Sequence, residues 1–66
     1  MNEEKLVAAA NELISIRERR GYSYPDGAAD KIARAGIATF KAGGDAHEVM
    51  DAMEQCAASL EVRAAA

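Results

Sequence analysis

The sequence predicts an all-α fold: a small three-helix bundle, with helices over about residues 3–20, 26–42 and 46–63. In each segment apolar residues recur three or four positions apart, which is the spacing of one helix face. The middle segment lacks the alternation by two that a half-buried strand would show. Glycines between the segments mark the helix ends. A chain of 66 residues suits one domain, so 1–66 is expected to be a single helical domain.

The middle segment is expected to be the helix on which the other two pack. Its apolar face consists of Ala29, Ile32, Ala33, Gly36, Ile37 and Phe40. Glycine inside a helix is about 1 kcal/mol less favourable than alanine. Because Gly36 shares its face with two alanines, we interpret it as a point of close approach by another helix. The simpler alternative is that a weak position is tolerated there.

The first helix is expected to end in a basic last turn. Arg17, Arg19 and Arg20 lie there, and acidic residues lie in the first turn, which is the order that the helix dipole favours. Gly21 follows as a left-handed C-terminal cap. Arg17 alone falls within the apolar arc. Either its stem covers apolar surface while the guanidinium reaches water, or its charge faces a carboxylate of a partner.

Two tyrosines occupy the connection between the first and second helices. Pro25 favours an extended Tyr24 and suits the first turn of the next helix. Ser23 or Asp26 is the expected N-cap of that helix. The tyrosines either close the open end of the bundle or contact a partner, a role in which tyrosine is common. The candidate partner-binding residues are therefore the basic and aromatic side chains around this turn: Arg17, Arg19, Arg20, Tyr22 and Tyr24.

The third helix has the clearest start signal. Gly43 and Gly44 end the preceding helix, and the short link predicts antiparallel neighbours. Asp45 and Glu48 then form a capping box. The apolar stripe of the third helix is Ala46, Val49, Met50, Met53, Cys56, Ala57 and Leu60. Its exposed side is expected to be acidic, formed by Asp45, Glu48, Asp51, Glu54 and Glu61.

A core of this size gives little stability on its own. Much of the hydrophobic half of the sequence is alanine, which buries little apolar surface. Ordering each residue costs about 1.5 kcal/mol, so the free energy gained by burial only roughly offsets this cost and the net stability is close to zero. We therefore expect the bundle to be completed by homodimerisation or by a partner protein. The expected helix–helix or dimer contacts are the small-residue face and two methionines: Ala29, Ala33, Gly36, Ile37, Phe40, Met50 and Met53.

Composition argues against several classes of function. The net charge of −3 disfavours general nucleic-acid binding. One cysteine, Cys56, fits a reducing compartment. No apolar run approaches the ~20 residues of a membrane span, so a cytoplasmic location is expected. His47 and Asp51 have no second histidine with which to complete a zinc site. We expect no metal, no cofactor, no membrane partner and no enzymatic activity.

The leading hypothesis is a non-enzymatic protein–protein interaction module that binds a larger bacterial protein and modulates or inhibits it. The small size, the alanine-rich helices and the lack of a catalytic motif are typical of small bacterial or phage accessory proteins.

Two alternatives belong to other classes of function. One is a small DNA-binding regulator, in which the second and third helices form a helix-turn-helix and Arg17, Arg19 and Arg20 contribute a basic patch; the acidic third helix counts against it. The other is a ligand-binding or enzymatic site at a dimer junction, which would combine Arg17 and Tyr22 of one chain with carboxylates of the other.

Overall fold

Three helices and a short two-stranded ladder make up residues 2–63, the part of the chain that the computed structural model describes. In chain order the elements are α1 (Glu3–Arg19), β1 (Tyr22–Ser23), α2 (Ala28–Lys41), α3 (Ala46–Leu60) and β2 (Val62–Arg63). The predicted set of three packed helices is confirmed. The prediction that the third helix continues to residue 63 is wrong, because β2 leaves the helix and pairs antiparallel with β1.

Local sequence signals explain most of the helix ends. Gly21 follows α1 with a φ of 97°, as predicted for a left-handed cap. The predicted capping box of α3 is also confirmed: Asp45 Oδ1 accepts from the Glu48 N–H at 2.8 Å, and Glu48 Oε1 accepts from the Asp45 N–H at 3.2 Å. At the start of α1, Asn2 Oδ1 accepts from the Lys5 N–H at 2.9 Å.

The start of α2 differs from the prediction. A turn precedes the helix, in which the Pro25 carbonyl accepts from the Ala28 N–H at 3.2 Å. Gly27 occupies the third position of this turn with a φ of 81°, a conformation that strongly favours glycine. Gly27 is therefore the N-cap, with no side-chain hydrogen bond, and the prediction of Ser23 or Asp26 for that role is wrong. The helix begins two residues later than expected.

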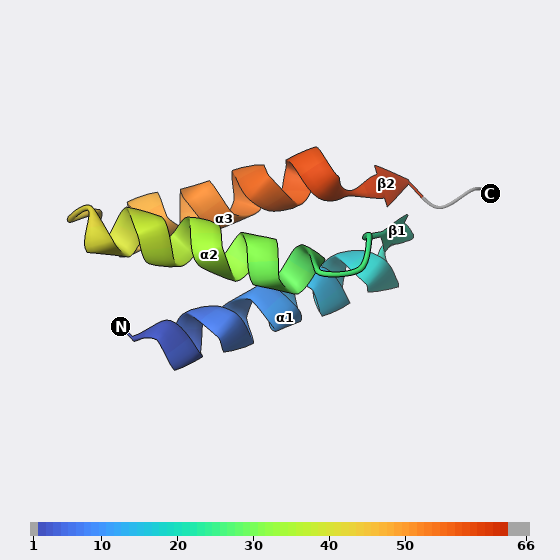
Figure 1. Cartoon of the computed structure of the whole chain (residues 1–66). Coiled ribbons are helices and arrows are strands. Elements are labelled where there is room, and N and C mark those ends of the chain that lie inside the picture. The colour runs from blue at the N-terminus through green and yellow to red at the C-terminus, as the bar shows by residue number, and fades with distance from the viewer. Residues whose placement is uncertain (1, 64–66) are drawn as a thin grey trace.

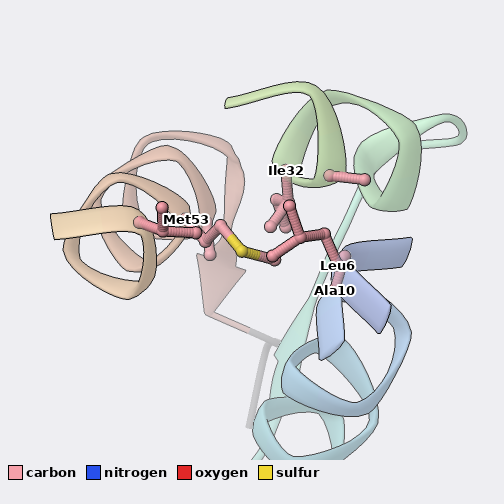
Figure 2. Packing of buried hydrophobic residues seen from close by; sticks show 7 residues of the cluster. Leu6, Ala10, Ile32 and Met53 are labelled. Carbon is pink, nitrogen blue, oxygen red and sulfur yellow. The ribbon is translucent and has the colours of Figure 1, made fainter. Parts of the chain in front are cut away.

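The central position of α2 organises the core. It packs along both α1 and α3, and it runs antiparallel to each of them (Figure 1). The buried cluster draws on all three helices and contains Leu6, Ala10, Ile32, Ala33, Val49, Met53 and Ala57. Figure 2 shows the Met53 side chain reaching from α3 toward Ile32 and Leu6. This one flexible side chain therefore fills the space where the three helices meet.

Gly36 is buried at the contact between α2 and α3. A Cβ atom at this position would lie 2.6 Å from Met53 Sδ and 3.4 Å from Val49 Cγ1. The first distance is well below van der Waals contact, so the absence of a side chain is what lets the two helices come this close. The close approach expected at Gly36 thus occurs between two helices of the same chain.

In contrast, α1 and α3 make no comparable helix–helix contact. They run in the same direction on either side of α2, and their C-terminal ends lie at the same end of the molecule (Figure 1). There the β1–β2 ladder, in which Tyr22 pairs with Arg63 and Ser23 with Val62, connects the segments that follow the two helices. Ser23 Oγ also donates to the Val62 carbonyl at 3.3 Å. The outer helices are thus joined at this end, and along their length they share the core with α2 without packing extensively on each other.

Candidate functional site

A connected polar cluster lies at the end of the molecule that carries the ladder; we call it the Arg17–Glu61 clasp, and it consists of Arg17, Tyr22, Tyr24 and Glu61. Arg17 Nε and Nη2 donate to Oε1 and Oε2 of Glu61 at 2.6 and 2.8 Å. Tyr24 Oη donates to Glu61 Oε1 at 2.7 Å. The Arg17 guanidinium carbon lies 4.7 Å from the centre of the Tyr22 ring, within the range of a cation–π contact.

The position of Glu61 corrects one prediction. The sequence places it on the exposed acidic side of the third helix, yet its side chain is only 13 % exposed. Glu61 is the C-cap of α3 and has an extended backbone, with φ −73° and ψ 145°. Its side chain therefore no longer follows the helical wheel, and it turns toward Arg17 of α1.

The clasp also fixes the protonation states of its members. Hydrogen bonds from Arg17 and then Tyr24 hold the pKa of Glu61 below its usual value. The hydrogen bond to Glu61 raises the pKa of Arg17. Burial, followed by the hydrogen bond to Glu61, raises the pKa of Tyr24. At neutral pH the clasp is therefore a charged arginine, a carboxylate and a neutral tyrosine, and none of these three groups is poised for general acid–base chemistry.

The second feature is a groove between the two outer helices, which we call the α1/α3 groove. It has a volume of about 590 Å³. The residues that line it come from α1, from α3 and from the C-caps of both helices: Ala9, Glu12, Leu13, Ile16, Arg17, Arg20, Met50, Glu54, Ala57, Ala58 and Glu61. The Arg17–Glu61 pair belongs to this lining and bridges the two walls.

Both walls of the groove carry the spacing of a helix-packing seam. On α1 and its C-cap the positions are Ala9, Leu13, Ile16 and Arg20, which follow i, i+4, i+7 and i+11. On α3 they are Met50, Glu54 and Ala57, which follow i, i+4 and i+7; Glu61 lies beyond them, where the backbone has left the helix. Alternation by three and four is the pattern with which a helix packs along another helix. Here the two seams face a shared groove and do not interlock with each other.

Charged residues border the apolar part of the groove lining, which consists of Ala9, Leu13, Ile16, Met50, Ala57 and Ala58. Glu12, Arg20 and Glu54 are exposed at the groove, and the ion pairs found within residues 2–63 involve none of them. Because α1 and α3 run in the same direction, Glu12 lies toward the end where α3 begins, and Arg20 lies toward the clasp. Along the α1 wall an acidic side chain therefore lies toward one end and a basic side chain toward the other, while the α3 wall adds the acidic Glu54.

The structure divides the predicted partner-binding residues into two groups. It brings Arg17, Tyr22 and Tyr24 together in the clasp, so the carboxylate that Arg17 meets belongs to its own chain. Arg19 and Arg20 remain exposed at the end of α1, and only Arg20 lines the groove.

The predicted helix–helix or dimer contacts also separate. Ala33, Gly36 and Met53 are buried between helices of one chain, and Ala29 and Ile37 are half-buried on α2. Phe40 is 40 % exposed near the end of α2. Met50 alone among the seven lines the groove.

Sequence reasoning missed Leu13 and Ile16 as site residues. Both are part of the apolar stripe of α1, and the structure leaves them half-buried at the groove. A signal existed: the stripe of α1 is broader than one neighbouring helix can cover. It includes Leu6, Ala10 and Ile14 on one side and Ala9, Leu13 and Ile16 on the other.

Other candidate chemistry finds little support in the geometry. His47 Nε2 lies 3.4 Å from Asp51 Oδ2, and both side chains are largely exposed on α3. Between residues 2 and 63, no three His, Cys, Asp or Glu side chains are grouped so that they could hold a metal ion. Within the same residues, no helix is both long and apolar enough to cross a membrane.

Comparison with models of protein families, with curated proteins and with solved structures finds no match to this chain.

Proposed function

We propose that this chain is a non-enzymatic helical protein–protein interaction module, and that its α1/α3 groove receives an amphipathic helix of another polypeptide. In the isolated protein the occupant is a second copy, which makes a homodimer. In the cell it is a helix of a larger bacterial protein, whose activity the binding modulates or inhibits. Because one groove accommodates one helix, the two occupants exclude each other.

The observation that carries the proposal is that both walls of the groove have large apolar side chains that the described part of the chain leaves partly uncovered. Ile16 and Leu13 on one wall and Met50 on the other are only half-buried within the chain. Burying such a side chain fully is worth roughly 1.5–3 kcal/mol. The walls extend over about three helical turns, from Ala9 to Arg20, so a helix of similar length would cover them. Laying an amphipathic helix in an apolar groove is a recurrent mode of recognition.

The alternatives draw less support from the same geometry. In a helix-turn-helix the two helices meet at roughly 90–120°, whereas α2 and α3 lie side by side and antiparallel. The exposed residues Glu48, Asp51 and Glu54 on α3 would also face phosphates. A dimer-junction site built on Arg17 would need a free guanidinium, and Glu61 of the same chain already holds it.

The homodimer is tested by sedimentation velocity and by the dependence of melting temperature on protein concentration, which dimerisation makes positive. Ile16→Glu places a charge inside the groove and should give a folded monomer. Val7→Glu is the matched control, because Val7 is also β-branched and on α1 but is 45 % exposed and lies outside the groove. A wild-type protein that stays monomeric at high micromolar concentration contradicts the homodimer.

The larger partner is tested by affinity capture from the native host with the same three proteins. A partner that binds in the groove is retained by the wild type and by Val7→Glu and is lost with Ile16→Glu. The captured protein, once purified, should compete with self-association as its concentration rises. A captured protein that binds all three variants equally contradicts the groove as the binding site.

A further inference from the structure

We infer that, in the homodimer, α1 of the second copy lies antiparallel in the α1/α3 groove, with Ile16 at the two-fold axis and Glu12 of each copy opposite Arg20 of the other. This inference rests on the proposed self-association through the groove. It adds three points to that proposal: which element of the second copy enters the groove, in which direction this element runs, and which residues determine that direction.

The first step is an edge of α1 that carries one acid and one base at equal distances from an apolar residue. Glu12, Ile16 and Arg20 are four residues apart, and all three line the groove. Eight residues of helix span about 12 Å, so Glu12 and Arg20 are too far apart to pair within one α1. Neither takes part in an ion pair within residues 2–63.

The second step is symmetry. In a two-fold interface, if residue i of one copy meets residue j of the other, then j meets i as well. Two antiparallel copies of α1 that cross at Ile16 therefore bring Glu12 opposite Arg20 twice. The parallel arrangement would bring Glu12 opposite Glu12 and Arg20 opposite Arg20, and like charges at a contact are unfavourable. The order of charges along the edge thus favours the antiparallel direction.

The third step is the fit of the entering helix to both walls. On the α1 wall, Leu13 comes near the aliphatic stem of the opposite Arg20, which can cover apolar surface while its charge pairs with Glu12. On the α3 wall, Ala57 is buried in the core and the exposed Ala58 carries only a methyl group, so a helix axis can come close there. The result is a four-helix core of two α1 and two α3 helices, with each α2 on the outside.

The ion pairs choose the direction and the register, and apolar burial supplies most of the affinity. Glu12 and Arg20 are exposed in the single chain, and pairs at the border of an interface are screened by salt. The test is therefore best made at low ionic strength.

The experiment is a charge reversal with mixing, followed by sedimentation velocity. Glu12→Arg and Arg20→Glu each bring like charges together at two places, so each variant alone should dimerise at least about tenfold more weakly than the wild type. An equimolar mixture of the two single variants should form a heterodimer, because every contact then joins opposite charges. The double variant Glu12→Arg/Arg20→Glu should recover the wild-type dissociation constant.

The matched controls are Glu18→Arg and Arg19→Glu, which make the same charge changes on exposed positions of α1 outside the groove. They should leave self-association unchanged. Circular dichroism checks that each variant is folded, and recovery in the mixture shows this independently.

The possible outcomes separate this inference from the proposed function. If Ile16→Glu abolishes the dimer but the mixture of single variants gains nothing, the groove is the interface and the antiparallel register is wrong. The register is equally wrong if Glu12→Arg weakens the dimer and Arg20→Glu does not, since Glu12 then faces another residue. If the wild type does not dimerise, both the homodimer and this register are overturned.

Discussion

Arg17 and Glu61 are 44 residues apart in the sequence, and their side chains are joined by two hydrogen bonds of 2.6 and 2.8 Å. This pairing ties the last turn of α1 to the C-cap of α3, two elements that otherwise stand apart on opposite walls of the groove. Tyr24 adds a third hydrogen bond to the same carboxylate. The clasp therefore adds a side-chain link between the outer helices at the end where the β1–β2 ladder joins the segments that follow them.

Glu61→Gln should lower the melting temperature by several degrees. The amide keeps the size of the side chain but loses the charge that Arg17 pairs with, and it can no longer accept on both terminal atoms. Glu18→Gln is the matched control, since it makes the same change at an exposed position of α1 outside the groove and should have little effect. Equal melting temperatures for the two variants would contradict a stabilising clasp.

Arg17→Lys should be destabilising in the same direction although it keeps the charge. Lysine cannot form two parallel hydrogen bonds to a carboxylate, and it stacks less well on the Tyr22 ring. A lysine variant as stable as the wild type would mean that the charge alone, without the guanidinium geometry, accounts for the clasp. Thermal unfolding followed by circular dichroism decides between the two.

The stabilisation from Glu61 should disappear in acid. The pKa of Glu61 is lower in the folded chain than its ordinary value of 4.5. The stabilisation is therefore complete above the unfolded-state pKa and is lost as the pH falls through the lower folded-state pKa. The difference in urea midpoint between the wild type and Glu61→Gln should be constant from pH 6 to 8 and shrink below roughly pH 4.5. If the difference in urea midpoint is as large at pH 2 as at pH 7, the ionised Glu61 carboxylate is not the source of the stabilisation.

Gly36→Leu should lower the free energy of unfolding by about 3 kcal/mol or more, because the new side chain overlaps Met53 in a filled core. Ala38→Leu is the control on the exposed side of α2 and should change stability by less than about 0.5 kcal/mol. Urea denaturation measures both. An unchanged midpoint for Gly36→Leu would contradict the close packing of α2 on α3.

A second substitution at Met53 tests whether the effect of Gly36→Leu comes from overlap with that side chain. Met53→Ala alone should cost about 2–5 kcal/mol, the usual range for truncating a buried methionine. In the double variant Gly36→Leu/Met53→Ala, the leucine can enter the space that the methionine leaves. We therefore expect the double variant to be more stable than the sum of the two single effects predicts, because residues in contact are not additive.

Asp45→Ala should destabilise the protein by about 1 kcal/mol, because α3 loses the acceptor that satisfies the Glu48 N–H. Asp51→Ala is the control, since it removes an aspartate further along the exposed side of the same helix. Chemical denaturation of the two variants gives the comparison. Equal loss from both would mean that general charge, and not the cap, is responsible.

The features that were predicted correctly from the sequence depend on neighbours in the chain. The cap at Gly21 and the box of Asp45 and Glu48 each involve a few consecutive residues, so residue type alone was sufficient. The close approach at Gly36 could also be predicted from the sequence, because a glycine that shares one helix face with alanines leaves room for a neighbouring helix axis. Periodicity gave the three helices, since it too is a local property of the chain.

The features that were missed depend on residues far apart in sequence. Nothing near Glu61 indicates that it leaves the helix and meets Arg17, and two-residue strands such as β1 and β2 are too short to produce an alternating pattern. The groove is a further case. The sequence shows that Leu13 and Ile16 are apolar positions, but only the structure shows that no part of residues 2–63 covers them fully.

The arrangement around α2 also has a consequence for the folding kinetics. Both extensive helix pairs, α1 with α2 and α2 with α3, join segments that are consecutive in the chain, and such local topologies fold fast. The clasp closes a much longer loop, so we expect it to form after the rate-limiting step. In stopped-flow experiments, Glu61→Gln should then accelerate unfolding and leave the folding rate nearly unchanged.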